Sequence, residues 1–241
     1  MVQPTNLFEH LLPMIFRVRG ILFDMDGVLV SSLGSVERSW QKWAESRGID
    51  PVFAIKTAHG RRAIETVRLL RPDLNDEQEL KWLEDMEVED RDGLEILNGV
   101  KPILESLPQK YWTVVTSATD RLARARMAYG GIPVPARMIT ADMVEKGKPD
   151  PEPYRRGAEL LGLAPADCLV IEDSASGTRA GHAAGCKVLA TLFSHSLESL
   201  AVADWIVESL ADVEVRIVND QVELTLEPVV REAAASSTVA H

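Results

Sequence analysis

Short apolar runs alternate with amphipathic segments from residue 99 onwards, and this alternation constrains the fold more strongly than any other feature of the chain. It predicts strands at 111–116, 137–140, 168–171 and 187–192, helices at 120–129, 151–162 and 175–184, and a final strand and helix over 204–216. Strands that alternate with helices of this length form βαβ crossovers, whose strands run parallel in a sheet covered on both faces. The pattern therefore predicts an α/β fold with a doubly wound parallel sheet.

One further strand of this sheet lies far upstream. The segment 14–23, MIFRVRGILF, ends in an apolar run that stops abruptly at Asp24, which is typical of a buried parallel strand. Between this strand and Gly99 there is no convincing strand, and helices are expected near 35–47, 60–70 and 76–91. An all-helical unit is therefore inserted into the α/β core after its first strand.

These patterns also give the expected domain boundaries. We expect a discontinuous core over 14–33 and 99–217, a helical cap domain over 34–98, an N-terminal extension over 1–13 and a C-terminal tail over 218–241. The last dozen residues, which end in AAASSTVAH, are expected to be disordered because they offer little apolar surface to bury.

Composition excludes several kinds of partner. The 26 basic and 37 acidic residues give a formal net charge of −11, which disfavours nucleic acid and anionic membranes because both bind basic surfaces. No run reaches about 18 apolar residues, and residues 1–17 lack the basic start of an export signal. Cys168 and Cys186 lie in apolar stretches, where buried thiols are expected. We therefore expect a cytoplasmic protein, a monomer or weak homodimer, whose partner is a small molecule.

Polar residues gather at the carboxyl ends of the predicted strands, where open parallel sheets bind their ligands. They are Asp24 and Asp26 after the first strand, Thr116 and Ser117 after the second, Lys148 in the loop that follows 137–140, and Glu172 and Asp173 after 168–171. Each alone has an ordinary explanation, such as a helix cap or a solvated loop lysine. Their occurrence together at successive strand ends favours a functional site.

Phosphoryl transfer through a carboxylate needs this set of groups. A phosphate monoester repels a carboxylate unless a cation neutralises both, and Mg²⁺ suits the carboxylates of Asp24 and Asp173, with the backbone carbonyl of Asp26 as a further ligand. Asp24 would attack phosphorus, while Asp26 would protonate the leaving oxygen and later deprotonate water. Thr116, its neighbouring N–H groups and Lys148 would hold the phosphoryl oxygens.

With these residues in view, the chain resembles the hydrolases of the haloacid dehalogenase superfamily that carry a helical cap. The four motifs of that superfamily are matched in order by Asp24-x-Asp26-Gly27, Thr116 at a strand end, Lys148 before Pro149, and Glu172-Asp173. The resemblance spans about residues 18–217. It implies Asp24 as nucleophile, Asp26 as acid/base, and Mg²⁺ on Asp24, Asp26 and Asp173, with Glu172 either on the ion or behind it.

Departures from relatives within that superfamily narrow the expected reaction. The dehalogenases lack the second aspartate of the first motif, so Asp26 favours phosphate over halide chemistry. The β-phosphoglucomutases carry a histidine ten residues after the acid/base aspartate, where this chain has Val36, so a phosphatase is favoured over a mutase. Ser31 replaces an acid that is common near the cap hinge. A phospho-accepting signalling receiver is a remote alternative, because receivers place their acidic pair on the first strand and have no helical cap.

Substrate choice is expected to lie in the cap, which closes over the site. The segment His59-Gly60-Arg61-Arg62 resembles the cap motif of small sugar- and polyol-phosphate phosphatases. Candidate substrate-binding residues are therefore Ser117, His59, Arg61 and Arg62. Other conspicuous side chains have structural interpretations: Trp40 and Trp43 are expected in the cap core, and Arg121, Arg124 and Arg126 on a solvated helix face. The sequence thus predicts a Mg²⁺-dependent phosphatase for a small phosphorylated sugar or polyol.

Overall fold

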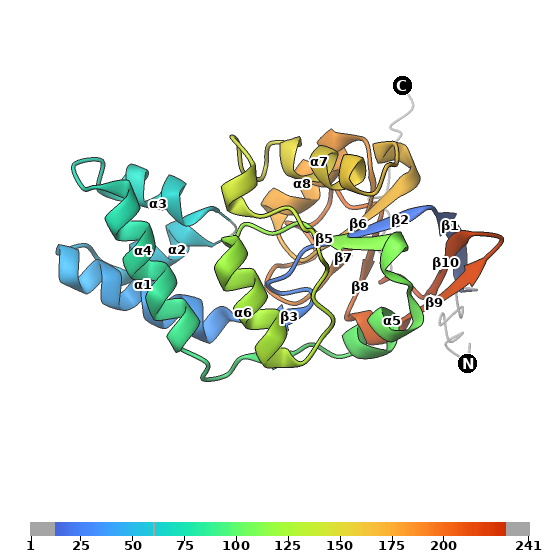
Figure 1. Ribbon diagram of the computed structural model, residues 1–241, viewed down its shortest axis with the longest axis horizontal. Coiled ribbons are helices and arrows are strands. Elements are labelled where there is room, and N and C mark those ends of the chain that lie inside the picture. The colour runs from blue at the N-terminus through green and yellow to red at the C-terminus, as the bar shows by residue number, and fades with distance from the viewer. Residues whose placement is uncertain (1–12, 60, 230–241) are drawn as a thin grey trace, which may run out of the picture.

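The computed structural model describes residues 13–59 and 61–229, and its centre is a five-stranded parallel sheet (Figure 1). The strand order is β5-β2-β6-β7-β8, which is formed by β5 (Trp112–Val114), β2 (Gly20–Phe23), β6 (Cys168–Glu172), β7 (Lys187–Thr191) and β8 (Trp205–Val207). Every residue of β2 and β6 is buried. The expected parallel sheet is confirmed, and the strand that precedes Asp24 lies inside it, between β5 and β6.

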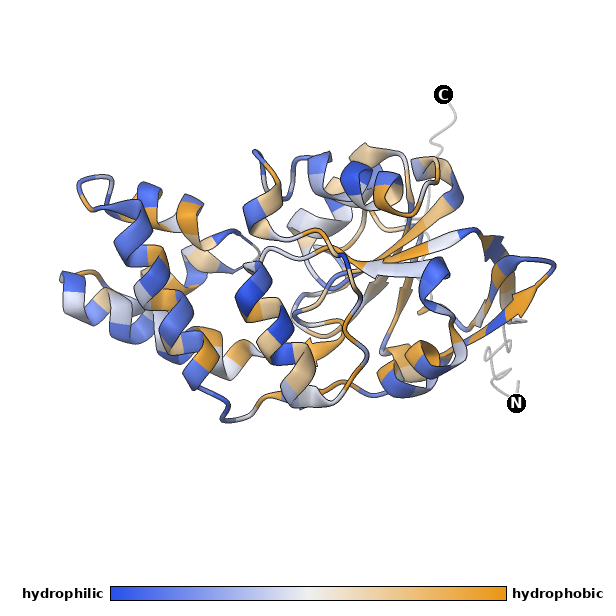
Figure 2. Cartoon of the chain, viewed as in Figure 1, coloured by the Kyte–Doolittle hydropathy of each residue, from blue (hydrophilic) through white to orange (hydrophobic). Residues whose placement is uncertain are grey.

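Helices cover both faces of this sheet, as a doubly wound fold requires. They are α5 (Val100–Ser106) and α6 (Asp120–Gly130) on one face, and α7 (Glu152–Leu160) and α8 (Ala175–Ala184) on the other (Figure 1). Successive side chains of β2 enter different hydrophobic clusters: Ile21 and Phe23 join one, and Leu22 joins the other. Side chains alternate across a strand, so a strand buried on both faces is apolar throughout (Figure 2).

Four helices form the insertion between the first strand and the rest of the core. They are α1 (Leu33–Arg47), α2 (Pro51–Ala58), α3 (Ala63–Leu70) and α4 (Asp76–Glu89). They bury a hydrophobic cluster of their own, in which Trp40 and Trp43 meet edge to face at 5.2 Å. The indole N–H of Trp43 donates to Glu79 at 2.6 Å. The core role expected for both tryptophans is confirmed, and the helical cap is present.

The two connections between cap and core pair with each other. β3 (Val30–Ser31) and β4 (Glu95–Ile96) form a short antiparallel ladder, although no strand was expected between the first strand and Gly99. Each strand has only two residues, which is too short to produce a periodic pattern in the sequence. The ladder fixes where the chain leaves and re-enters the core.

The sequence-based prediction was wrong at the beginning and at the end of the core. The segment 14–23 is two strands, and β1 (Met14–Val18) leaves the parallel sheet to form an antiparallel sheet of order β1-β10-β9, with β9 (Val213–Val218) and β10 (Gln221–Leu226). The helix expected by 216 is therefore wrong: only the short turn η4 (Leu210–Asp212) precedes β9. The tail expected from 218 is wrong over 221–226, where alternating apolar residues pack against β1 and the core.

Smaller elements complete the described chain. Three further 3₁₀ turns are η1 (Gln109–Tyr111), η2 (Ala141–Met143) and η3 (Pro165–Asp167). The strand expected at 137–140 is reduced to one bridge between Val115 and Ile139. No helix within the described residues combines the length and apolarity that crossing a membrane requires. The disorder expected for the last dozen residues falls outside the described residues, and so does the extension expected over 1–13 apart from Pro13.

Candidate active site

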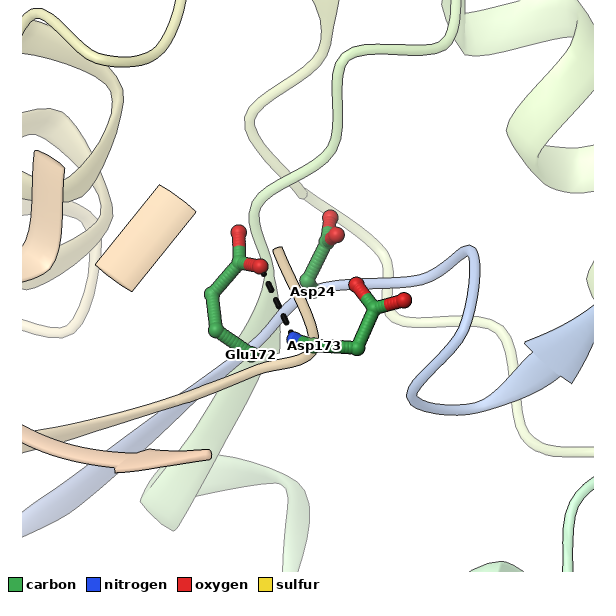
Figure 3. A group of neighbouring side chains, drawn as sticks. All are labelled: Asp24, Glu172 and Asp173. Atoms are coloured by element: carbon green, nitrogen blue, oxygen red, sulfur yellow. Dashed lines mark hydrogen bonds between the residues drawn. The ribbon is translucent and has the colours of Figure 1, made fainter. Parts of the chain in front are cut away.

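Three acidic side chains converge where the parallel strands end. Asp24 directly follows β2, Glu172 is the last residue of β6, and Asp173 comes next (Figure 3). The neighbouring strands hold this edge in register, because the Asp24 N–H donates to the Ile171 carbonyl at 2.9 Å. One carboxylate oxygen of each residue lies within 4.8 Å of the others. The parallel sheet therefore brings together acids that are about 150 residues apart in the chain.

A single buried lysine neutralises part of this charge. Lys148 is 3% exposed, and its Nζ lies 2.8 Å from Asp24 Oδ1 and 2.7 Å from Glu172 Oε1. It also donates to the Val115 carbonyl at 3.2 Å. Burial alone would lower the pKa of Lys148, but the two carboxylates outweigh it and raise that pKa. The ammonium group is therefore held charged between the first and last motifs.

Glu172 is saturated with hydrogen bonds. Its Oε1 accepts from the Tyr154 hydroxyl at 2.7 Å as well as from Lys148, and its Oε2 accepts from the Asp173 N–H, the Ser174 N–H and the Ser174 hydroxyl. Burial would raise the pKa of Glu172, but Lys148 and these donors lower it. Gly177 makes room for the carboxylate, since a Cβ there would lie 1.6 Å from Oε1. Glu172 is thus an ionised residue that supports the site from behind.

Asp24 and Asp173 face the cavity, and their negative charges are compensated by fewer donors and cations than the charge of Glu172. Burial raises the pKa of Asp24 to about 7, against the opposing influence of Lys148. Burial and the neighbouring acids Glu172 and Asp24 raise the pKa of Asp173 as well. When all three carboxylates are ionised, one ammonium group leaves two negative charges in a buried place, and the raised pKa values of Asp24 and Asp173 express the cost of this state without a counterion. The charge and the oxygen donors fit a divalent cation that prefers carboxylates.

Gly27 lets the first motif approach the last. Its φ is +83°, and a Cβ on it would lie 1.9 Å from Asp173 Oδ2. A residue with a side chain would therefore be strained in its backbone and would also displace the Asp173 carboxylate. The Ser194 hydroxyl donates to the same oxygen of Asp173. The space left by Gly27 and the hydrogen bond from Ser194 together fix the orientation of Asp173.

Asp26 lies beside the acidic group but its side chain is not part of it. Its Oδ1 accepts from the Ser32 hydroxyl at 2.6 Å and from Arg126 at 2.8 Å. The expected contact of a metal ion with Asp26 is through its backbone carbonyl, and it stays a prediction. The expectation for Arg126 was wrong: it is 4% exposed and also pairs with Glu87 of α4 at 2.7 Å.

The second motif offers two adjacent predicted site residues, Thr116 and Ser117, which the structure places differently. Ser117 lines the cavity, whereas Thr116 is 4% exposed and its hydroxyl accepts from the Ala118 N–H at 3.0 Å. The Thr116 N–H is used as well, because it donates to the Ile139 carbonyl at 2.9 Å. Adjacent side chains at a strand end point to opposite sides, so only one of the two reaches the cavity. Ser117 is the residue placed to meet a ligand.

A cavity of about 690 Å³ lies between core and cap, within the range of small-molecule sites. His59 and Arg61 line it, as do Asp24, Lys148 and Asp173. The cavity thus places the polar strand ends opposite the cap motif.

Arg62 also lines this cavity, but its guanidinium group is already engaged. Its Nε donates to Glu65 at 2.8 Å, and its two terminal nitrogens donate to the carbonyls of Val144 and Glu145, each at 2.8 Å. Both carbonyls belong to the core loop that carries Lys148. Arg62 therefore ties the cap to this loop, a contact that the sequence did not predict.

The fold and the site define a capped α/β hydrolase with a buried acidic centre. The chain belongs to the haloacid dehalogenase-like hydrolase family, whose sequence model matches residues 18–185. It is therefore an enzyme of the hydrolase class, and the family expected from the four motifs is confirmed.

Individual relatives agree with this assignment. The chain is 38% identical over 204 residues to hexitol phosphatase A of Escherichia coli (strain K12), which covers 83% of this chain and 94% of that protein. It is 31% identical over 230 residues to glycerol-1-phosphate phosphohydrolase 1 of Saccharomyces cerevisiae (strain ATCC 204508 / S288c), which covers 88% and 92%. The crystal structure of CbbY from Rhodobacter sphaeroides in complex with phosphate has the same fold, with a TM-score of 0.70, 21% identity and coverage of 81% and 96%.

Several supporting residues escaped the sequence analysis. Tyr154 and Ser174 hold Glu172, and Ser32 holds Asp26. Only Ser174 carried a signal, because it follows the acidic pair and caps α8. The others act through contacts between distant segments, which neither spacing nor periodicity encodes.

Proposed function

We propose that this enzyme is a Mg²⁺-dependent phosphatase for a small phosphorylated sugar or polyol and that it works through a phosphorylated Asp24. The observation that carries the proposal is the buried group of Asp24, Asp173 and Glu172 with the buried cation Lys148, at the core end of a cavity covered by the cap. A cytoplasmic location is part of the same proposal.

The residues fit a divalent cation, as the two uncompensated charges indicate. Asp24 and Asp173 would hold Mg²⁺, while Glu172 lies behind them with both oxygens already used by other donors. When bound, the ion supplies positive charge that lets an anionic phosphate approach a carboxylate. Lys148 and Ser117 would hold the phosphoryl oxygens from the other side.

The side chains of this chain account for both chemical steps. In the first step an Asp24 oxygen forms a bond to phosphorus, the bond from phosphorus to the substrate oxygen breaks, and Asp26 gives that oxygen a proton. In the second step Asp26 takes a proton from a water molecule as the water oxygen bonds to phosphorus, and the bond to Asp24 breaks. The products are the alcohol and inorganic phosphate, and both aspartates return to their initial state.

The relatives support the substrate class. The names of two of them specify a hexitol phosphatase and a glycerol-1-phosphate phosphohydrolase, and the cavity has room for a small polyol. Val36 lines the cavity at the position where the mutases that resemble this chain carry a histidine, which favours hydrolysis over transfer to a second hydroxyl.

Phosphate release from a panel of hexitol, glycerol, sugar and nucleotide monophosphates tests the proposal. We expect Asp24→Asn to abolish Mg²⁺-dependent release while the circular dichroism spectrum stays unchanged. Full activity of this variant would refute the mechanism. Interconversion of glucose 1-phosphate and glucose 6-phosphate without phosphate release would instead identify a mutase.

A further inference from the structure

Arg126 is a buried cation that links the proposed acid/base residue to the cap. It projects from α6, a core helix, and only 4% of its side chain is exposed. One terminal nitrogen donates to Asp26 Oδ1 at 2.8 Å, and the other donates to Glu87 Oε2 at 2.7 Å. Glu87 belongs to cap helix α4 and is itself buried. A single guanidinium group therefore joins a core loop, a core helix and the cap.

This arrangement has a cost that packing alone does not explain. Burying a guanidinium group is expensive unless its hydrogen bonds are made, yet the Nε of Arg126 is buried without a partner among the described residues. Its neighbour on the same helix, Arg121, forms its ion pairs with α4 while half exposed. Fastening α4 to α6 therefore does not require a buried arginine. What distinguishes Arg126 is its bond to Asp26.

The bond constrains how the Asp26 carboxyl group is turned. Both of its donors, Ser32 and Arg126, bind Oδ1, and no hydrogen bond from the described residues reaches Oδ2. Two donors on one oxygen prevent rotation of the carboxyl group and leave the other oxygen available for a proton. Because a guanidinium group is rigid and planar, its bond to Glu87 also fixes the direction of its bond to Asp26.

We propose that Arg126 is a positioning residue that orients the Asp26 carboxyl group for proton transfer, and that Glu87 makes this orientation depend on the docking of cap helix α4 against α6. The inference rests on the proposed function, in which Asp26 exchanges the proton with the leaving group.

Substrates whose leaving groups differ in basicity distinguish a role of Arg126 in positioning Asp26 from a purely structural role. The alkoxide of glycerol 1-phosphate must be protonated as it leaves, whereas 4-nitrophenolate leaves without a proton. The value of kcat/KM reports the steps up to formation of the phosphoenzyme, so it excludes the later water attack, in which Asp26 serves both substrates. Misplacement of Asp26 should therefore lower kcat/KM for glycerol 1-phosphate far more than for 4-nitrophenyl phosphate.

We expect Arg126→Met to lower kcat/KM for glycerol 1-phosphate about 30-fold and that for 4-nitrophenyl phosphate less than about threefold, because misplacing Asp26 loses only part of the roughly 10²–10⁴-fold that proton transfer contributes to catalysis. Glu87→Met should change the ratio of the two values in the same direction by a smaller factor. The double variant R126M/E87M removes both buried charges, so it provides a folded test if Arg126→Met does not fold. The matched control is Arg121→Met, which cuts ion pairs across the same α4–α6 contact without touching Asp26 and should leave the ratio unchanged.

The reference variant is Asp26→Asn, which distinguishes a failure of the proposed function from a failure of the positioning role of Arg126. If Asp26→Asn lowers kcat/KM equally for both substrates, the proposed proton-transfer role of Asp26 is refuted. Asp26→Asn is expected to change the ratio of kcat/KM for the two substrates. If it does so but Arg126→Met and R126M/E87M lower kcat/KM equally for both, the positioning role of Arg126 is overturned while the proposed function stands. An unchanged ratio in Glu87→Met would overturn the dependence on the cap.

Discussion

Replacement of Lys148 by methionine is the perturbation with the clearest energetic consequence. Met has a similar shape but no charge, so Asp24 and Glu172 lose the cation that lies 2.8 and 2.7 Å from them. Glu172 is fully buried, and Asp24 is nearly so. Removing one partner from a buried ion pair costs about 3–5 kcal/mol, because an uncompensated charge is left in the protein interior.

The matched control uses the same carboxylate oxygen. Tyr154→Phe removes a neutral donor that binds Glu172 Oε1 at 2.7 Å and leaves the charges in place. A hydrogen bond to a charged group contributes about 1.5–3 kcal/mol, so this variant should lose less stability than Lys148→Met. For a protein of this size 1 kcal/mol shifts the melting temperature by roughly 2–4 °C, so a loss of about 4 kcal/mol corresponds to roughly 8–16 °C for the lysine variant.

Thermal unfolding followed by circular dichroism in EDTA measures the loss, and its pH dependence identifies the cause. In the wild type the pKa of Glu172 is lowered below its ordinary value of 4.5, so this residue stabilises the fold above that pH and the contribution is lost as the pH falls. Without Lys148, only the hydroxyl and backbone donors on Glu172 oppose the effect of burial, so we expect its pKa to rise and its ionisation to destabilise the fold as the pH rises. The deficit of the variant should therefore grow between about pH 5 and pH 8. A deficit below about 1 kcal/mol, or one that does not change with pH, would refute the reasoning.

Two further changes test how the site is held in place. Gly27→Ala should destabilise the fold by about 1–3 kcal/mol and reduce activity, since φ is +83° there and the new Cβ would displace the Asp173 carboxylate; wild-type melting temperature and kcat/KM would contradict this. The Gly147 N–H in the same loop donates to Glu65, the partner of Arg62, at 3.2 Å. Arg62→Met should raise hydrogen exchange at this amide at least about tenfold, because the loop loses two charge-assisted hydrogen bonds worth about 1.5–3 kcal/mol each. Unchanged exchange would show that Arg62 does not hold this loop.

The first motif and the sheet were predictable because each depends on a local pattern. The run that ends at Phe23 is apolar, which is typical of a strand buried on both faces, and Asp24 marks its end. Positions shaped by distant contacts were less predictable. Thr116 and Ser117 are both polar at a strand end, and the choice between them follows from the hydrogen bond of Thr116 to Ala118.

The edges of the fold show the same limit. Residues 221–226 alternate in polarity as a strand does, but they become an ordered strand only through pairing with β1, about 200 residues earlier. Arg126 lies on the same face of α6 as Leu122 and Ala123, but its charge and the other basic residues of that helix favoured the expectation of a solvated position. Its partners Asp26 and Glu87 are 100 and 39 positions away.

The sequence by itself determined the fold class, the family and the acidic strand ends, because hydrophobic period, glycine at a turn and residue type are properties of short segments. Only the tertiary structure decided which of these groups meet and which donors each one uses. In the folded protein Arg62, expected to bind substrate, connects the cap to the core loop through its hydrogen bonds. Arg126, expected to be solvated, is a buried partner of Asp26. The physical reason is that the burial and pairing of a charge depend on segments that come together only when the chain has folded.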